Sequence, residues 1–302
     1  MQTSKRSSYI PEELLFSVLN YVLIILACLT VLFPLLNITA LAFNSGADAQ
    51  RGGIYLWPRV WSLQNFTEVF TQSHMVNGFL VSLFRTVVGT AASVFMTALA
   101  AYALTSRTLP ARGPIAFMIF FTMLFSGGLI PYYLVLKDLH LTNTIWVYIV
   151  PSLYSVWNMM VMRTFFQQVP VELQEAARMD GLSETGIFFK LILPLSKPVL
   201  ASMALFNGVS HWNDWFTGAF FVREQQLKPA ATLLQEMLIS QEALSQSLLR
   251  PGRAYEMLDR MQATGESLKM AMILLVILPI LFVFPFVQKH FTKGVSAGAL
   301  KE

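Results

Sequence analysis

The stretch QQVPVELQEAARMDGLSETGIFFKLILPLSK, residues 167–197, decides how the rest of the chain is organised. It is polar, and long apolar runs lie on both sides of it. Pro170 suits the first position of a helix, because the N–H that proline lacks would have no partner there. Gly181 follows Asp180 and is free to adopt the left-handed conformation that ends a helix. The segment is therefore predicted to contain two short helices joined by a glycine.

The first of these helices has a polar start and one small apolar face. Glu172 and Glu175 fall in its first turns, where the helix dipole favours negative charge. Leu173, Ala176 and Ala177 share a face by their i, i+3, i+4 spacing. Spacing alone also permits an amphipathic helix that rests in lipid headgroups.

The second helix is predicted to begin after Ser183, whose hydroxyl suits an N-cap. Pro194 is expected to stop it. Between these limits it carries the apolar residues Ile187, Phe188, Leu191 and Ile192.

The composition indicates a membrane protein. Hydrophobic residues make up 55% of the 302 residues and charged residues 13%, whereas soluble domains carry roughly 25% charged residues. The net charge of +4 is modest and no basic run with interleaved aromatic residues occurs, so we expect no nucleic-acid partner. A single cysteine cannot form an internal disulfide, and the four histidines lie in different segments, so no metal site is expected.

Six apolar stretches are long enough to cross a bilayer, which needs roughly 20 residues per helix. We therefore expect an all-α, polytopic membrane protein in which residues 1–302 form a single transmembrane domain. Lys and Arg are slightly more frequent in the segments that lie inside when both termini are cytoplasmic, and this favours that orientation. The region 222–266 then becomes an extracytoplasmic loop. The predicted spans are 20–43, 78–104, 115–136, 144–165, 198–221 and 267–288.

The first span resembles a signal peptide in two respects. Lys5 and Arg6 give it a basic start, and Ala40-Leu41-Ala42 resembles a cleavage site. The apolar run from Tyr21 to Phe43 is longer than the roughly 7–15 residues of a signal peptide's apolar region. We expect a retained helix.

The third span is predicted to break at Gly127 and Gly128. Paired glycines weaken a helix, and Pro131 removes a backbone donor nearby. In a membrane such backbone persists only where protein or a cavity supports it, so we expect this break beside a transport path.

The fifth span carries a polar stripe, since Asn207, Ser210, His211 and Asp214 follow i, i+3, i+4, i+7 spacing. Such a stripe is expected to face protein or water rather than lipid. Trp212 and Trp215 beside the stripe offer flat apolar faces to a substrate, and alternatively they anchor the span at the membrane interface. The predicted substrate path comprises Asn207, His211, Trp212, Asn213, Asp214 and Trp215, with Tyr154 and Asn158 on an opposite wall and Gly127 and Gly128 at the break.

The polar segment resembles the EAA loop of ABC importer permeases. That loop reads E-A-A, three residues, G, nine residues, then I-x-L-P. Glu175-Ala176-Ala177, Gly181 and Leu191-Ile192-Leu193-Pro194 follow this spacing, with Leu191 in place of the usual Ile. The loop is the strongest motif in the chain because two parts match across a fixed gap.

Further segments resemble the carbohydrate branch of this family, the maltose-type inner-membrane subunits that import oligosaccharides. They are Thr97–Leu104, Phe125–Pro131, Trp212-Asn213-Asp214-Trp215 and Lys293–Ala299. Together they extend the resemblance over nearly the whole chain. It implies the type I importer permease architecture in a bacterial cytoplasmic membrane.

The resemblance also implies the partners. A helix of the EAA loop docks in a groove of a dimeric ABC ATPase, where Glu175 pairs with a basic residue and Gly181 lets the helix turn away. The expected ATPase-coupling residues are Glu172, Glu175, Ala176, Ala177, Asp180, Gly181, Leu193 and Pro194. A second permease of different sequence, an extracytoplasmic binding protein and a sugar or oligosaccharide complete the importer.

We expect no enzymatic activity and no cofactor in the chain itself. A Walker A loop needs G-x-x-x-x-G-K-[ST], and no Lys here precedes Ser or Thr. ATP and magnesium would therefore be held by the ATPase subunit.

Three other classes of protein fit the sequence less well. An ion-coupled secondary transporter usually buries several ionisable residues and shows repeats, whereas the spans here carry mainly Arg85 and Asp214. A membrane scaffold would not need a glycine-hinged helix. An ABC permease for amino acids or peptides differs only in the fifth-span and C-terminal motifs.

Overall fold

The computed structural model describes residues 12–49, 51–106, 109–248, 265–283 and 285. These residues form helices and connecting loops without a strand, and their one isolated β-bridge joins Asn44 to Trp61. The chain divides into two compact units. Unit 1 comprises residues 1–69 and 247–274, and unit 2 comprises residues 70–246 and 275–302.

Within the described residues, three single helices are long and apolar enough to span a bilayer, namely α1 (Glu12–Ala42), α4 (Ser73–Ala103) and the last described helix, 265–283. Three further candidate spans are bent pairs of helices. They are Arg112–Leu124 with Leu129–Asp138 at 116°, Ile145–Ser152 with Val156–Phe166 at 45°, and Glu184–Leu195 with Lys197–Asn213 at 81°. Counting each pair as one span gives up to six. The predicted all-α, polytopic fold is thus confirmed.

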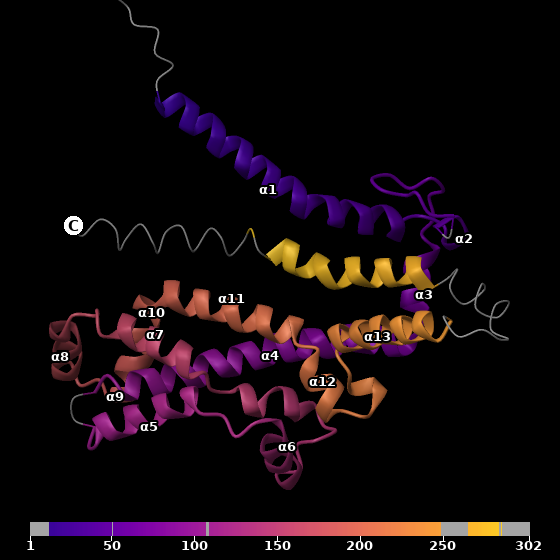
Figure 1. Ribbon diagram of the computed structural model, residues 1–302. Coiled ribbons are helices and arrows are strands. Elements are labelled where there is room, and N and C mark those ends of the chain that lie inside the picture. Colours follow the sequence, from indigo (N-terminus) through magenta and orange to yellow (C-terminus); the bar gives the residue numbers. More distant parts are fainter. Residues whose placement is uncertain (1–11, 50, 107–108, 249–264, 284, 286–302) are drawn as a thin grey trace, which may run out of the picture. The chain divides into compact units, whose positions relative to one another are not determined.

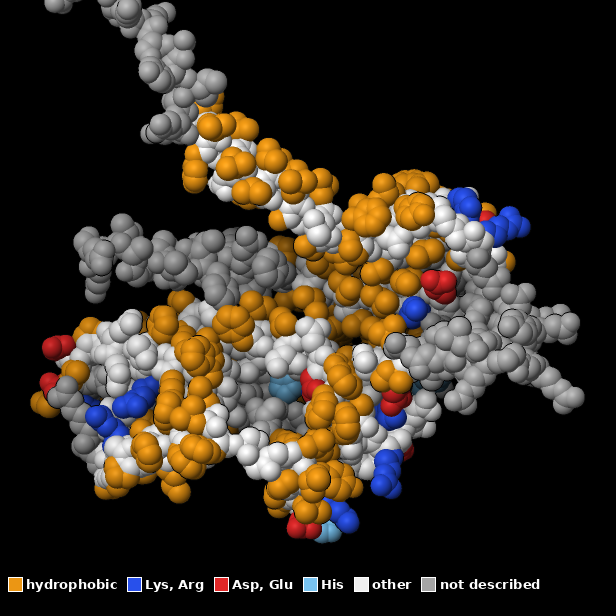
Figure 2. Space-filling model, in the orientation of Figure 1, with side chains coloured by type: hydrophobic (Ala, Val, Ile, Leu, Met, Phe, Trp, Pro, Cys, Tyr) orange, Lys and Arg blue, Asp and Glu red, His pale blue; other side chains and the backbone are white. Residues whose placement is uncertain are grey.

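Unit 1 begins with α1, whose surface is almost entirely apolar. Its residues from Leu14 to Phe33 are all exposed, and Figure 2 shows hydrophobic side chains along the whole described helix. Exposed apolar surface of this extent is stable only against lipid or another protein. The unit continues with α2 (Gly46–Ala49) and the start of α3 (Gln64–Thr71).

Two buried asparagines hold the loop that follows α1. Asn44 is fully buried, and its Oδ1 accepts a hydrogen bond from the Val60 amide at 2.9 Å. The Asn65 amide donates to the carbonyls of Ala42 and Asn44 at 2.8 and 2.9 Å. Buried backbone groups need hydrogen-bond partners. In this loop the two asparagine side chains supply partners that a helix or a sheet would otherwise provide.

Unit 2 is organised around α4, which packs against α7 (Val156–Phe166) and α11 (Lys197–Asn213). The α4 face that is buried between them is lined by Gly89, Ser93, Thr97 and Ala101, which recur every fourth residue. Small residues of this kind let helices approach closely where lipid supplies no hydrophobic drive. This stripe serves helix packing within the chain.

The polar segment 167–197 lies at one end of unit 2 (Figure 1). It contains α8 (Val171–Met179), α9 (Glu184–Ile187), the π-helical turn η3 (Phe188–Ile192) and α10 (Leu193–Leu195). Ile187, Phe188 and Ile192 are fully buried against α4 and α7 residues. The segment is therefore packed onto the spans and is not a free loop.

The third span is broken, as predicted from its glycines. It consists of α5 (Arg112–Leu124) and α6 (Leu129–Asp138), which meet at 116°. Gly128 has φ +88°, a conformation that side-chain-bearing residues rarely adopt. Pro131 lies in the first turn of α6, where its missing N–H leaves no helical hydrogen bond unmade.

The fourth and fifth spans depart from the straight helices that hydropathy suggests. The fourth is built from the 3₁₀ turns η1 (Ile145–Tyr148) and η2 (Val150–Ser152) followed by α7, which Ser155 caps by accepting from the Asn158 amide. The fifth ends its long helix at Asn213 and resumes as α12 (Phe216–Phe221). Apolar composition predicts where a chain enters the bilayer but not where its helices break.

The loop after the fifth span contains η4 (Gln225–Leu227) and α13 (Ala230–Leu248). Residues 249–264 of the predicted loop lie outside the described residues, as do the end of the predicted sixth span and the C-terminal motif 293–299.

The contact between α4 and α11 yields the first prediction. A Cβ on Gly89 would lie 2.7 Å from the buried His211 ring, so Gly89→Ala should destabilise the purified complex by about 1–3 kcal/mol through overpacking. A lower apparent Tm in lipid nanodiscs would report this. Gly113→Ala is the matched control, because nothing lies within 4 Å of its Cβ. Equal melting of the two variants would contradict the close approach.

Candidate functional site

A polar cavity of about 190 Å³ lies in unit 2 where α11 gives way to α12. Side chains from α4, α6, the 3₁₀ turns, α11 and α12 meet there. We call it the polar cavity, and its lining comprises Arg85, Tyr132, Val147, Tyr148, Pro151, Ser152, Asn207, Ser210, His211, Asp214 and Thr217.

An ion pair between Arg85 and Asp214 dominates this cavity. The Arg85 Nη2 lies 2.6 Å from Asp214 Oδ2, and its Nη1 donates to the Asp214 carbonyl at 2.9 Å. The Arg85 side chain is 3% exposed and that of Asp214 is 26% exposed. The guanidinium therefore binds both the charge and the backbone at the point where the fifth span breaks.

Asp214 also starts the helix that follows the break. Its Oδ1 accepts a hydrogen bond from the Thr217 amide at 3.1 Å, which satisfies one donor in the first turn of α12. One carboxylate thus joins the end of α11, the start of α12 and the guanidinium from α4.

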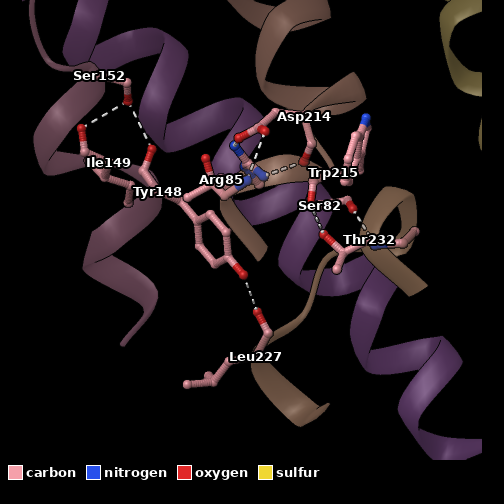
Figure 3. Close-up of polar contacts among 11 residues, drawn as sticks. Ser82, Arg85, Tyr148, Ile149, Ser152, Asp214, Trp215, Leu227 and Thr232 are labelled. Atoms are coloured by element: carbon pink, nitrogen blue, oxygen red, sulfur yellow. Dashed lines mark hydrogen bonds and ion pairs between the residues drawn. The ribbon is translucent and has the colours of Figure 1, made fainter. Parts of the chain in front are cut away.

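Tyr148 completes the surroundings of Arg85 (Figure 3). The guanidinium carbon lies 4.4 Å from the centre of the Tyr148 ring, a cation–π contact. The Tyr148 hydroxyl donates to the Leu227 carbonyl at 2.9 Å. Nearby, the Ala230 amide donates to Ser82 and the Thr232 hydroxyl donates to the Trp215 carbonyl. These contacts tie η1, α4 and the residue before α12 to the segment 227–232.

The predicted polar stripe of the fifth span is brought together as expected. Asn207, Ser210, His211 and Asp214 all line the polar cavity. Asn207 Oδ1 accepts from the Asn158 amide at 3.1 Å, whereas its own Nδ2 is buried without a protein partner. A buried amide donor without a partner is a place for water or a ligand hydroxyl.

Other residues of the predicted path lie elsewhere. Trp212 is buried, and its indole N–H donates to the Val276 carbonyl at 2.9 Å. Asn213 and the two glycines, Gly127 and Gly128, are exposed. Tyr154 packs beside the core cluster at the α8 end, and Trp215 is 37% exposed. None of these side chains lines the polar cavity.

Several residues that line the polar cavity were not predicted from the sequence. Arg85 was visible as a charge within an apolar run, but its partner was not. Tyr132, Tyr148, Ser152 and Thr217 gave no signal, because hydroxyl-bearing residues are ordinary in apolar spans and only the breaks bring these together.

The second candidate site is α8 with its glycine. Gly181 has φ +82°, and a Cβ there would meet nothing within 4 Å. The Ser183 hydroxyl accepts from the Gly186 amide at 3.2 Å and caps α9, as predicted. Pro170 occupies the N-cap of α8, one position earlier than expected.

Most of the surface of α8 is exposed. Ala177 is its only buried residue, whereas Glu172, Glu175, Ala176 and Asp180 are exposed. Met179 is 88% exposed. A short helix that presents most of its surface fits a groove in another subunit.

Leu193 and Pro194 lie in α10, where Leu193 is half-buried and Pro194 is exposed. The expected stop at Pro194 is wrong by one residue, because the helix continues to Leu195 before the chain turns by 81° into α11. Pro194 comes shortly after the π-helical turn η3, one residue before this continuous helix ends.

Glu184 connects the loop to α4. Its carboxylate accepts hydrogen bonds from Arg178 Nε at 2.9 Å and from the Tyr102 hydroxyl at 2.8 Å. The bond from Arg178, and after it that from Tyr102, holds the pKa of the Glu184 carboxyl below its ordinary value. The carboxylate therefore stays charged at neutral pH and joins α8, α9 and the end of α4. The motif did not identify this contact.

The described residues contain no group of three or more His, Cys, Asp or Glu side chains placed to hold a metal ion. Broken spans beside a polar cavity are typical of a membrane permease, and the projecting helix α8 offers a surface for another subunit.

Residues 78–297 match the family model of the binding-protein-dependent transport system inner membrane component. The chain belongs to this family, and it is therefore a multi-pass permease subunit of a bacterial ABC importer, not an enzyme. Importers of this family contain a second permease, an ATPase and a substrate-binding protein.

Two relatives from Bacillus subtilis are similar over most of their length. The chain is 36% identical over 287 residues to the polygalacturonan/rhamnogalacturonan transport system permease protein YtcP, covering 95% of this chain and 98% of the relative. It is 38% identical over 273 residues to the protein LplC, covering 89% of each. A solved structure of a bacterial ABC transporter involved in the import of the acidic polysaccharide alginate matches with a TM-score of 0.83 and 27% identity, covering 94% of this chain and 99% of the matched chain.

The ion pair yields the second prediction. Asp214→Asn leaves a buried guanidinium without a counter-charge, so the complex should lose about 3 kcal/mol of stability. The double variant Arg85→Gln with Asp214→Asn should melt at a higher temperature than Asp214→Asn alone, because no buried charge remains. Thermal unfolding of all four members of this cycle in nanodiscs measures the coupling. Strictly additive effects would show that the pair carries no mutual stabilisation.

Proposed function

We propose that this chain forms one half of the translocation path for an oligosaccharide, with the polar cavity as its substrate-contacting wall. The observation that carries the proposal is the convergence of Asn207, Ser210 and His211 with hydroxyl-bearing residues at a break in the fifth span. Transporter sites are typically formed where spans are discontinuous. The sugar-transport names of the relatives support the same class of substrate.

The chemistry of the cavity suits a neutral polyol ring. Hydroxyl and amide groups can pair with sugar hydroxyls, and Tyr132, which is exposed, offers a ring beside them. The one cation, Arg85, is already neutralised by Asp214. At about 190 Å³ the cavity is smaller than the roughly 300–1,000 Å³ of ligand pockets. The rest of the path would come from a second permease, which we propose is a different chain.

We propose further that α8 docks in the ATPase subunit, which would hold ATP and magnesium. The exposed Glu172 and Glu175 would face basic groups there, and Gly181 would let the chain turn back to the membrane. Motion of α8 would pass through Glu184 and Tyr102 to α4, as a rigid-body shift of packed helices.

Docking of α8 in the ATPase would fix the orientation of the chain. With α8 at the ATPase, both termini are cytoplasmic and the region 222–266 faces the extracytoplasmic binding protein. Within unit 2, the α12–α13 end lies opposite α8 (Figure 1), which is consistent with this proposal.

A third prediction tests the docking helix. Gly181→Val places a β-branched residue at φ +82°, at a cost of about 1–3 kcal/mol that would shift the end of α8. ATPase activity stimulated by the loaded binding protein should fall severalfold while membrane insertion persists. Gly53→Val is the matched control, because Gly53 has φ +73° and equally open surroundings outside the loop. Full stimulation of the Gly181→Val complex would refute the docking role.

A fourth prediction tests the sugar path. Asn207→Ala removes an amide that lines the cavity. Oligosaccharide uptake should therefore fall by roughly tenfold at most, which corresponds to the free energy of one hydrogen bond. Basal ATPase activity and assembly should persist. Ser202→Ala on the same helix, outside the cavity lining, should leave uptake unchanged. If assembly and ATPase coupling fail together while selectivity among oligosaccharides and peptides never changes, Asn207 is structural.

A further inference from the structure

A second cavity, of about 410 Å³, lies next to the polar cavity in unit 2. Its volume falls within the roughly 300–1,000 Å³ that ligand pockets have. We call it the basic cavity, and its lining comprises Tyr133, Lys137, Thr142, Asn143, Phe220, Phe221 and Arg223. None of these residues lines the polar cavity or belongs to α8.

The two cations of the basic cavity have no counter-charge in its lining. Lys137 and Arg223 are its only charged residues, and among the described residues neither forms an ion pair with a carboxylate within 4.0 Å. Asp138 and Glu224 follow them in sequence but do not line the cavity. The polar cavity differs, because its one arginine is paired with Asp214.

The backbone around these cations is held in place. Asn143 has φ +58°, and its Oδ1 accepts hydrogen bonds from the amides of Arg223 and Glu224, both at 2.9 Å. The backbone N–H of Asn143 donates to the Phe221 carbonyl at 2.8 Å. The loop that follows α6 is thus joined to the segment that leaves α12, and the Asn143 side chain fixes the backbone at Arg223.

The two cavities lie along one aromatic wall. The Phe221 ring meets Tyr132 edge-on at 5.5 Å and stacks with Tyr133 at 6.2 Å. Tyr132 lines the polar cavity and Tyr133 lines the basic one. Likewise Thr217, early in α12, faces the polar cavity, whereas Phe220 and Phe221 at its end face the basic one.

We propose that the basic cavity binds the carboxylate of an acidic sugar, a uronic-acid unit of the oligosaccharide, before the oligosaccharide reaches the polar cavity. The inference rests on the proposed function and names its substrate class. Lys137 and Arg223 would donate charge-assisted hydrogen bonds to the carboxylate, and the aromatic rings would contact the apolar face of the sugar. Because Arg85 is already neutralised, the anion is attracted to the basic cavity and is not held in the polar one.

The test measures binding and transport separately. The purified importer with all its subunits is titrated with trigalacturonate and with its fully methyl-esterified, neutral counterpart, using saturation-transfer NMR. The double variant Lys137→Gln with Arg223→Gln should weaken trigalacturonate binding about tenfold and leave the weaker binding of the neutral ester unchanged. Lys137→Arg with Arg223→Lys should retain binding, since both charges remain.

A control for the loss of a positive charge outside the basic cavity is Arg51→Gln, on an exposed loop of unit 1. It should leave trigalacturonate binding unchanged. Equal affinity of the wild-type complex for the acid and the ester, or equal loss of both in the double variant, would overturn the proposal.

A second measurement tests whether the basic cavity instead contacts the binding protein. The concentration of binding protein that half-saturates ATPase stimulation should be the same for the wild type and the double variant. A rise in that concentration, with trigalacturonate binding unchanged, would assign the basic cavity to protein docking and overturn the proposal. Failure of the wild-type complex to transport any oligosaccharide would instead refute the proposed function, whereas uptake of neutral sugars alone would refute only the acidic subsite.

Discussion

The contact between Arg85 and Asp214 is the constraint on which the site depends. A guanidinium cannot be deprotonated in a protein, and one that is 3% exposed within a membrane span needs a partner of opposite charge. Asp214 meets that need with its carboxylate and also with its carbonyl. To offer both groups, the chain must leave the helical conformation at this residue. The break between α11 and α12, and the polar cavity beside it, follow from that requirement.

The same long helix connects this pair to the candidate coupling loop. Arg85 lies within α4, and Tyr102 near its end donates to Glu184 of the loop. Between them, the small residues at 89, 93, 97 and 101 hold α4 against α7 and α11. A close-packed interface of this kind shifts as a rigid body more readily than it deforms. The structure therefore provides a continuous physical connection between the projecting helix α8 and the cavity, along one element.

Irregular backbone in this protein occurs where side chains support it. The η1–η2 turns place Tyr148 and Ser152 in the polar cavity, and the bend between α5 and α6 orients Tyr132 toward it and Tyr133 toward the basic cavity. Hydropathy predicted apolar stretches in these regions, and the glycines at 127 and 128 correctly predicted one break. The other breaks have no glycine pair to mark them, since they depend on partners far along the chain, such as Arg85 for Asp214 and Asn143 for Arg223.

The sequence by itself determined the membrane-spanning character, the helix–glycine–helix segment and the shared face of Asn207, Ser210 and His211, because hydropathy, capping and helical periodicity are local properties. It also indicated Arg85 as a charge in an apolar run. Only the tertiary structure decided that Trp212 packs inward onto Val276, that Tyr154 lies away from the cavity, and that Lys137 and Arg223 share one. Such pairings join residues dozens of positions apart. They are settled by which buried charges and donors find partners when the helices pack, and no local pattern records this.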